Sequence, residues 1–257
     1  MSILACFGGS TTSFDFIEQE HHWLTLLHKQ IPKLSKLKLE NFGINGGTNT
    51  EIFTSVLDVL TRNNQISICL ISWVYPVRYR LSLGFELYPT IDGFNHTHDV
   101  GVNGFTIPRS YLTNIGQRFF ALHHIHFEYV KLLTYINIIK RLCDQNNIKV
   151  FFVNDSCGWD LGYFDRQVDV LPDQYTDFTQ HDILNVNNRS DEEIFKLYQK
   201  LHDEYDAAGG IQKDSWLNLY QSLFSLIDDY ASDGCHPGPI SNKIFVTMLL
   251  DRLCQQV

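Results

Sequence analysis

The sequence lacks three features that would each place it in a particular class of protein. It has no cluster of Lys and Arg residues, and its formal net charge of −9 has the wrong sign for binding a nucleic-acid backbone. No apolar run approaches the roughly 18 residues of a membrane span. The first apolar run, "ILACF" (3–7), has no basic start and is too short for a signal peptide. We therefore expect a cytoplasmic protein with no nucleic-acid partner and no membrane span.

Charged residues and paired cysteines are also scarce. Only 19% of the residues are charged while 44% are hydrophobic, which excludes a disordered chain and provides for a sizeable core. The six cysteines contain no Cys-x-x-Cys pair, and without an export signal we expect reduced thiols. The length of 257 residues suits one large domain, or a core domain with an insertion.

What the sequence does contain is an alternation of predicted strands and helices. The apolar runs predict strands at 2–7, 37–44, 66–74 and 148–154, and the helical spacing of apolar residues predicts helices at 15–31, 48–62, 117–147 and 239–256. This order predicts the α/β class, as a three-layer α/β/α sandwich around a mostly parallel sheet. Two stretches break the alternation, so we expect a single domain over 1–257 with insertions at about 79–116 and 155–215.

The first strand ends in the turn "CFGGSTTSF" (6–14). Its two glycines tolerate positive φ and a close approach of other groups, and the hydroxyl residues from Ser10 to Ser13 are good helix N-caps. An ordinary turn between a strand and a helix explains this stretch by itself. A functional interpretation requires partners elsewhere in the chain.

Two further stretches provide such partners. In "DGCHPGPISNKIF" (233–245), Asp233 precedes His236 by three residues, so its carboxylate can fold back onto the imidazole Nδ1–H and leave Nε2 as a base. A serine hydroxyl needs such an oriented histidine to become a nucleophile. In "NFGINGGTN" (41–49), the turn around Gly46 can present backbone N–H groups to an oxyanion. Each stretch alone is also compatible with an ordinary solvated turn.

These three blocks together resemble the SGNH (GDSL-type) hydrolase family. Gly8-Gly9-Ser10 stands where the family has Gly-Asp-Ser, the stretch 41–49 is similar to its second block, and Asp233-x-x-His236-Pro is similar to its last. The resemblance implies an SGNH/flavodoxin-like sandwich. It also implies a serine esterase that cleaves an acyl or acetyl ester, in a small molecule or an acylated glycan, without cofactor or metal.

The resemblance also implies roles for individual residues. Ser10 would be the nucleophile, His236 the general base and Asp233 its orienting acid, while the N–H groups of Ser10 and Gly46 would hold the oxyanion. Gly9 departs from the family pattern because it replaces the aspartate of the first block.

A second departure concerns the oxyanion hole. The family's third block, Gly-x-Asn-Asp, is missing from "ISWVYPVRYR" (71–80), so the side chain of Asn49 or Ser72 would have to replace the absent donor. The alternative for Asn49 is plain N-capping of a helix. Trp73 and Arg78 are candidates to line a substrate pocket, and the alternative for Ser72 and Trp73 is simple packing.

Other conspicuous residues have ordinary explanations. We expect "HTHD" (96–99) to be a polar loop and "HHIHFE" (123–128) to present an exposed helix face, in preference to metal sites. "HHW" (21–23) is predicted to pack Trp23 onto the sheet, with His21 and His22 at the rim.

Two other function classes stay open. A phosphate binder could use "GGSTT" (8–12) at a helix N-terminus, but the stretch lacks the spacing and the Lys of a phosphate-binding loop. A non-catalytic relative could use the same cleft to bind a glycan or a protein, and the missing third-block Asn favours it. Cys235 is interpreted as a small turn residue and not as a nucleophile.

Overall fold

The structure is a computed structural model of the 257-residue chain. It describes residues 2–74, 78–80, 90–92, 100–102, 105–107, 125–154, 217, 223, 226–234 and 236–256. The chain divides into two compact units, of which unit 1 comprises Met1–Val74, Tyr135–Asp160 and Ile211–Val257, and unit 2 comprises Tyr75–Thr134 and Leu161–Gly210. Unit 2 contains the first predicted insertion and most of the second, and the single domain with two insertions stays a prediction.

Among its described residues, unit 1 is built on a four-stranded sheet in the order β2-β1-β3-β8, in which the described pairings are all parallel. The strands are β1 (Ile3–Gly8), β2 (Lys38–Gly43), β3 (Ile66–Trp73) and β8 (Lys149–Asn154). β1 is buried throughout and β3 almost so, which explains their nearly continuous apolar sequences. Each of these strands was predicted from its apolar run to within two residues at either end.

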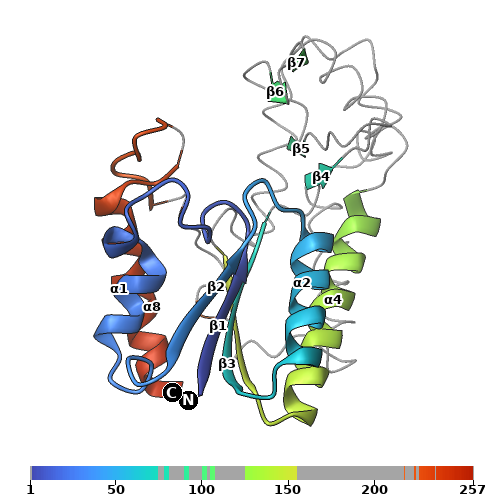
Figure 1. Ribbon diagram of the computed structural model, residues 1–257, viewed down its shortest axis with the longest axis vertical. Coiled ribbons are helices and arrows are strands. Elements are labelled where there is room, and N and C mark those ends of the chain that lie inside the picture. The colour runs from blue at the N-terminus through green and yellow to red at the C-terminus, as the bar shows by residue number, and fades with distance from the viewer. Residues whose placement is uncertain are drawn as a thin grey trace, which may run out of the picture. The chain divides into compact units, whose positions relative to one another are not determined.

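Helices cover both faces of this sheet (Figure 1). α1 (Trp23–Gln30) and α8 (Pro239–Gln256) lie on one face, and α2 (Asn49–Arg62) lies on the other with the unit 1 part of α4 (Ile125–Gln145). The three-layer α/β/α sandwich with a parallel sheet is therefore confirmed. Of the described helices, none combines the length and the apolarity needed to cross a membrane.

The core on the α1 and α8 face joins the two ends of the chain. Apolar side chains of alternate strand positions, such as Leu4 and Leu70, pack with Trp23 of α1 and Phe245 of α8. The Trp23 and Phe245 rings meet edge to face, with centroids 5.5 Å apart. The prediction that Trp23 packs onto the sheet is confirmed.

The predicted helix at 15–31 is wrong in its first half. A short 3-10 turn, η1 (Gln19–His21), precedes α1, which begins only at Trp23. The imidazole of His22 accepts a hydrogen bond from Leu24 N–H and caps α1, so the helix cannot extend backward through it. His22 is only 1% exposed, which corrects its predicted position at the rim.

Unit 2 contains two antiparallel strand pairs among its described residues. β4 (Arg78–Arg80) pairs with β5 (Thr90–Asp92), and β6 (Val100–Val102) pairs with β7 (Phe105–Ile107). The motif at 96–99, the side chains of the motif at 123–128, the side chain of Arg78 and Cys235 lie outside what the structure describes. Four described cysteines are free thiols, as expected: Cys6, Cys69, Cys143 and Cys254.

Candidate active site

The predicted site residues at the ends of β1, β2 and β3 come from segments that meet at one edge of the sheet. β1 lies between β2 and β3, and Gly8 at its end is in register with Gly43 of β2. Ser10 follows β1, Gly46 follows β2, and Ser72 lies near the end of β3. Because all these strands run parallel, their carboxyl ends share an edge, where open α/β sheets form their sites.

A tight turn places Ser10 directly after β1. The Gly9 carbonyl accepts the N–H groups of Thr12 and Ser13, both at 3.1 Å. A Cβ atom at Gly8 would lie 2.0 Å from Thr12 Oγ1, and one at Gly43 would lie 2.5 Å from Ser13 N. Glycine is therefore required at Gly8 and Gly43 for close approach and not for positive φ, which among the described glycines occurs at Gly46 and Gly234.

Side chains from two other elements hold the carbonyl groups of this turn. Asn41 of β2 donates from Nδ2 to the Thr12 carbonyl at 2.7 Å and accepts Gly43 N–H at 2.8 Å. The Thr11 carbonyl accepts hydrogen bonds from His22 Nε2 at 3.0 Å and from Trp23 Nε1 at 2.9 Å. The turn that carries Ser10 is thus fixed from both β2 and α1.

The hydrogen bonds of His22 define its protonation state. Because Nδ1 accepts Leu24 N–H, the proton of the neutral ring must lie on Nε2, which faces the Thr11 carbonyl. Burial lowers the pKa of His22 to about 4, although the backbone hydrogen bonds to Thr11 and Ser13 act in the opposite direction. His22 is therefore a neutral structural donor and not a base.

Asp233 and His236 form the second half of the site. The carboxylate of Asp233 accepts His236 N–H at 3.0 Å and the imidazole Nδ1–H at 2.5 Å. The loop is closed by a hydrogen bond from Ala231 N–H to the His236 carbonyl at 2.7 Å, and Gly234 adopts φ +69° at its tip. The contact between the Asp233 carboxylate and the His236 imidazole, which the spacing of the two residues predicts, is therefore present. It leaves Nε2 of His236 available as a base.

Phe16 connects this loop to the Ser10 turn. Its ring stacks on the His236 imidazole with centroids 3.8 Å apart and an interplanar angle of 9°. The stack brings the segment that follows Ser10 against the proposed base. Among the described residues no hydrogen bond joins Ser10 Oγ to His236, and in unliganded enzymes such bonds are often long. Their predicted approach stays a prediction.

Asp229 holds the His236 loop against the start of α8. Its carboxylate accepts the N–H groups of Ile240 at 3.0 Å and Ser241 at 2.8 Å, and its carbonyl accepts Gly238 N–H at 2.9 Å. Burial acts to raise the pKa of Asp229, but these hydrogen bonds prevail and the pKa lies below its usual range. Nothing in the sequence pattern indicates this contact, since Asp229 lies ten residues before α8.

The structure changes the interpretation of Asn49. The N-cap of α2 is Thr48, which forms a capping box with Glu51, so N-capping by Asn49 is wrong. The Asn49 amide instead donates to the Val74 carbonyl at 2.9 Å and accepts Val74 N–H at 3.0 Å. It thereby holds the chain that leaves β3. Its predicted role as an oxyanion donor stays a prediction.

Ser72 and Trp73 end β3 on opposite faces of the sheet. Both are buried, at 1% and 0% exposure, and in the described part of the chain neither Ser72 Oγ nor Trp73 Nε1 has a hydrogen-bond partner. Ser72 lies beside Gly8, where its Cβ would be 2.9 Å from an added Cβ. Trp73 packs against Phe152, with ring centroids 6.4 Å apart. Their predicted contact with substrate is not tested by this geometry.

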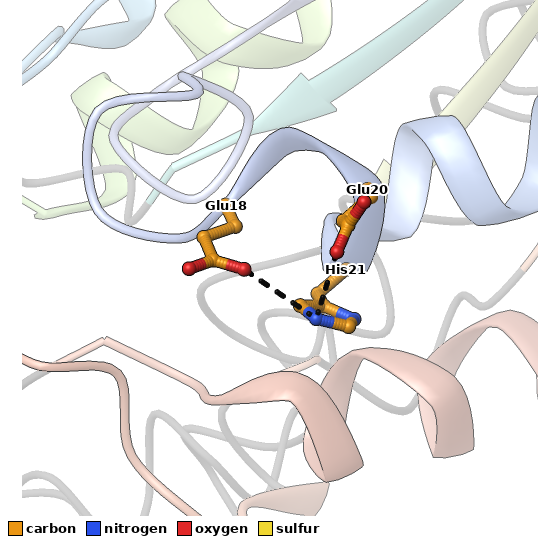
Figure 2. Close-up of side chains that lie close together, drawn as sticks. All are labelled: Glu18, Glu20 and His21. Atoms are coloured by element: carbon orange, nitrogen blue, oxygen red, sulfur yellow. Dashed lines mark ion pairs between the residues drawn. The ribbon is translucent and has the colours of Figure 1, made fainter.

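A separate polar cluster lies on η1 and on Glu18, the residue directly before it (Figure 2). His21 Nε2 is 3.6 Å from a carboxylate oxygen of Glu18 and 3.5 Å from one of Glu20. Their possible ligand atoms all lie within 4.8 Å of one another, but both glutamates are exposed, and such groups are common without a bound ion. We assign no function to this cluster.

Comparisons with known proteins find similar folds only. No protein-family model matches the sequence, and no curated protein matches it.

One similar solved structure is a member of the lipolytic protein G-D-S-L family from Veillonella parvula, at 10% identity and TM-score 0.46, with 100% of both chains covered. Another is Est24, a carbohydrate acetylesterase from Sinorhizobium meliloti, at 11% identity and TM-score 0.47, also with 100% of both chains covered. A third is the psychrotrophic esterase EstA from Pseudoalteromonas, at 10% identity and TM-score 0.45, with 99% of this chain and 98% of that chain covered. At such identities and TM-scores, these structures assign no role to any residue of this chain.

Proposed function

We propose that the protein is a serine ester hydrolase in which Ser10 is the nucleophile, His236 the general base and Asp233 its orienting acid. The observation that carries the proposal is the arrangement around His236. Its Nδ1–H is held by Asp233, and its ring is stacked on Phe16, in the segment that follows Ser10. A base oriented in this way beside a serine turn is the arrangement that acyl transfer requires.

The proposed reaction has two steps. Ser10 Oγ attacks the ester carbonyl while His236 Nε2 takes its proton, and the same proton then passes to the leaving alcohol to give an acyl-serine. His236 then deprotonates a water molecule, whose oxygen attacks the acyl carbon; the bond to Ser10 Oγ breaks, His236 returns the proton to Oγ, and the acid is released. Asp233 keeps the imidazole in the required tautomer and stabilises the imidazolium, and the N–H groups of Ser10 and Gly46 are the proposed oxyanion donors.

A fluorophosphonate probe tests the assignment, because it forms an adduct only with an activated serine. We expect the wild type to be labelled on Ser10 and the Ser10→Ala variant to be unlabelled and inactive. Asp233→Asn should retain measurable turnover, because removing the orienting acid lowers the rate less than removing the nucleophile does. Wild-type turnover by Ser10→Ala would exclude this nucleophile.

The substrate we propose is a small acyl or acetyl ester, including acetylated sugars. Initial rates on acetylated sugars and on p-nitrophenyl esters of increasing chain length distinguish a preference for sugar acetates from a preference for simple acyl esters. The measurement needs the full chain, because the predicted insertions are expected to contribute to the choice of substrate.

A second candidate is a non-catalytic module that binds a glycan or a protein at the same edge of the sheet. The observation that favours it is the engagement of the Asn49 amide by both the N–H and the carbonyl of Val74. If neither Asn49 nor Ser72 replaces the missing donor, the proposed oxyanion hole has two backbone donors, and the loss of one donor costs about 10²–10³ in rate in another serine hydrolase. No labelling of a folded wild type would favour this candidate.

A further inference from the structure

We propose that a buried chain of hydrogen bonds between α1 and α8 fixes the Ser10 turn relative to the His236 loop. The chain runs from the Thr11 carbonyl through His22 and Trp23 to Asn242 and ends at the Pro237 carbonyl. The inference rests on the proposed function, since it makes His22, Trp23 and Asn242 positioning residues for the proposed nucleophile and base.

The first link of the chain lies next to Ser10. Two side chains at the start of α1, His22 and Trp23, donate to the same acceptor, the Thr11 carbonyl. Both side chains are 1% exposed, and Thr11 is 6% exposed. Because water does not compete at such a site, these bonds restrict the backbone beside the nucleophile more strongly than surface bonds would.

The second link connects α1 to the loop of the proposed base. Trp23 N–H donates to Asn242 Oδ1 at 2.9 Å, across 219 positions of the chain. Asn242 Nδ2 donates to the carbonyls of Pro237 at 3.0 Å and Gly238 at 2.8 Å. Pro237 directly follows His236, so the amide group of Asn242 bridges the start of α1 and the exit of the His236 loop.

The amide of Asn242 is suited to this bridge because it offers one acceptor and two donors in fixed directions. All three positions are engaged, and the side chain is 2% exposed. A carboxylate could not donate to the two carbonyls, and an apolar side chain would leave Trp23 N–H and the Pro237 carbonyl unpaired. The bridge sets the distance between the two halves of the site, and an error of about 1 Å at reacting groups can cost about 100-fold in rate.

Two conservative substitutions remove the donors of the first link. Trp23→Phe removes the indole N–H but keeps an aromatic ring against Phe245. His22→Asn keeps a residue that caps α1 well, while its shorter side chain does not reach the Thr11 carbonyl. Either donor alone still satisfies this carbonyl, so the two substitutions should be strongly non-additive.

The test measures kcat and KM for both single variants and for the double variant, with rates normalised to folded protein. We expect kcat to fall about 2- to 3-fold in each single variant and about 100-fold in the double variant, far more than the roughly 4- to 9-fold product of two independent effects, with KM changed by less than about twofold. Ile139→Ala is the control for lost packing, because Ile139 is buried in α4 on the opposite face of the sheet. It should reduce stability without lowering kcat of the folded fraction.

The outcomes separate the two proposals. If wild type is labelled and hydrolyses esters but the double variant keeps wild-type kcat, the positioning inference is overturned and the proposed function stands. If the double variant does not fold, the single variant Trp23→Phe decides the question, and an unchanged kcat in it overturns the positioning inference. If folded wild type is neither labelled nor active, the proposed function fails, and the positioning roles fail with it.

Discussion

At the residue scale, the imidazole of His236 is held on two sides. Asp233 faces its Nδ1 edge, and the ring of Phe16 covers one of its faces. The carboxylate fixes the tautomer, whereas the stacked ring limits rotation of the imidazole out of the plane in which Nε2 can serve as a base. The two contacts therefore restrict different motions of the same side chain.

Substitution of Phe16 tests the second contact. Aromatic stacking contributes about 0.5–1.5 kcal/mol beyond area burial, so Phe16→Leu should lower kcat roughly 2- to 10-fold. Phe16→Tyr keeps the stacked ring and should stay close to wild type. Steady-state kinetics of the two variants on one p-nitrophenyl ester provide the comparison. Equal rates for Phe16→Leu and wild type would show that Phe16 does not orient the base.

Contacts between residues close in the sequence could be predicted, whereas contacts that depend on how the helices pack could not. The contact of Asp233 with His236 was predictable because it spans three residues and depends only on a local turn. Asn242 is predictable as part of the last helix, but its contact with Trp23 depends on how α1 packs on α8. Phe16 and His22 both lay within the predicted helix at 15–31, where His22 was expected at the rim, so their contacts with His236 and Thr11 were not predicted.

At the scale of elements, α2 is connected to the end of β3 through Asn49. Its amide pairs with both polar groups of the Val74 backbone, much as a neighbouring strand would. The chain that leaves β3 is consequently held where the third block of the SGNH family would begin. This contact explains why an asparagine is useful at the first position of a helix that Thr48 already caps.

Asn49→Asp tests this connection. The carboxylate can still accept Val74 N–H, but its second oxygen would face the Val74 carbonyl in a site that is 5% exposed. We expect a loss of about 1–3 kcal/mol in the free energy of unfolding, measured by urea denaturation. If Asn49 is only a clamp, kcat of the folded fraction stays near wild type. A fall of about 100-fold in kcat at unchanged stability would instead identify it as an oxyanion donor.

The start of α8 depends on Asp229 in a comparable way. Asp229→Ala would leave two N–H groups of the first turn without their acceptor and should lower the free energy of unfolding by about 1–2 kcal/mol. Because the same carboxylate joins residue 229, which precedes the His236 loop, to the first turn of α8, which follows it, kcat should fall as well. Asp228→Ala is the matched control, since the neighbouring Asp228 is exposed. Thermal unfolding and kinetics of both variants check this expectation, and equal effects of the two substitutions would contradict it.

The elements themselves were largely predictable because their periodicity is strong. α2 and α8 begin within a residue of their predicted starts, since Thr48 and Pro239 are local start signals. The helix predicted from residue 15 failed because a buried histidine stops α1 at Trp23, and nothing in the spacing distinguishes that histidine from an exposed one. β2 is mostly half-buried whereas β8, at the other end of the described strand order, is buried from Val150 to Val153, so the order of strands alone does not explain the lower burial of β2.

At the scale of the whole molecule, His22 makes folding sensitive to acid. Its pKa is about 4 in the folded protein and about 6.5 in an unfolded chain. Above pH 6.5 both states are neutral at this residue. Between pH 6.5 and 4 the unfolded state binds a proton that the folded state does not bind. The free energy of unfolding should therefore decrease by about 3 kcal/mol across this window.

Chemical denaturation of wild type and His22→Asn at pH 7, 6 and 5 measures this contribution. Aspartate and glutamate residues titrate in both proteins, so the informative quantity is the difference between them at each pH. We expect the advantage of wild type over the variant to shrink steadily from pH 7 to pH 5. A difference that does not change with pH would show that His22 is protonated as readily in the folded state as in the unfolded chain.

The bond between Trp23 and Asn242 also has a consequence for biosynthesis. Because its partners are 219 positions apart, a ribosome delivers the serine turn early and the histidine loop near the end of translation. Until α8 emerges, the part of α1 that packs against α8, including the Trp23 ring that meets Phe245, has no cover, and the nascent chain offers it to chaperones or to aggregation. In the proposed mechanism, a polypeptide interrupted before residue 236 carries a serine without its base. Prematurely terminated products would be catalytically silent, and esterase activity would appear only once the closing helix has been synthesised.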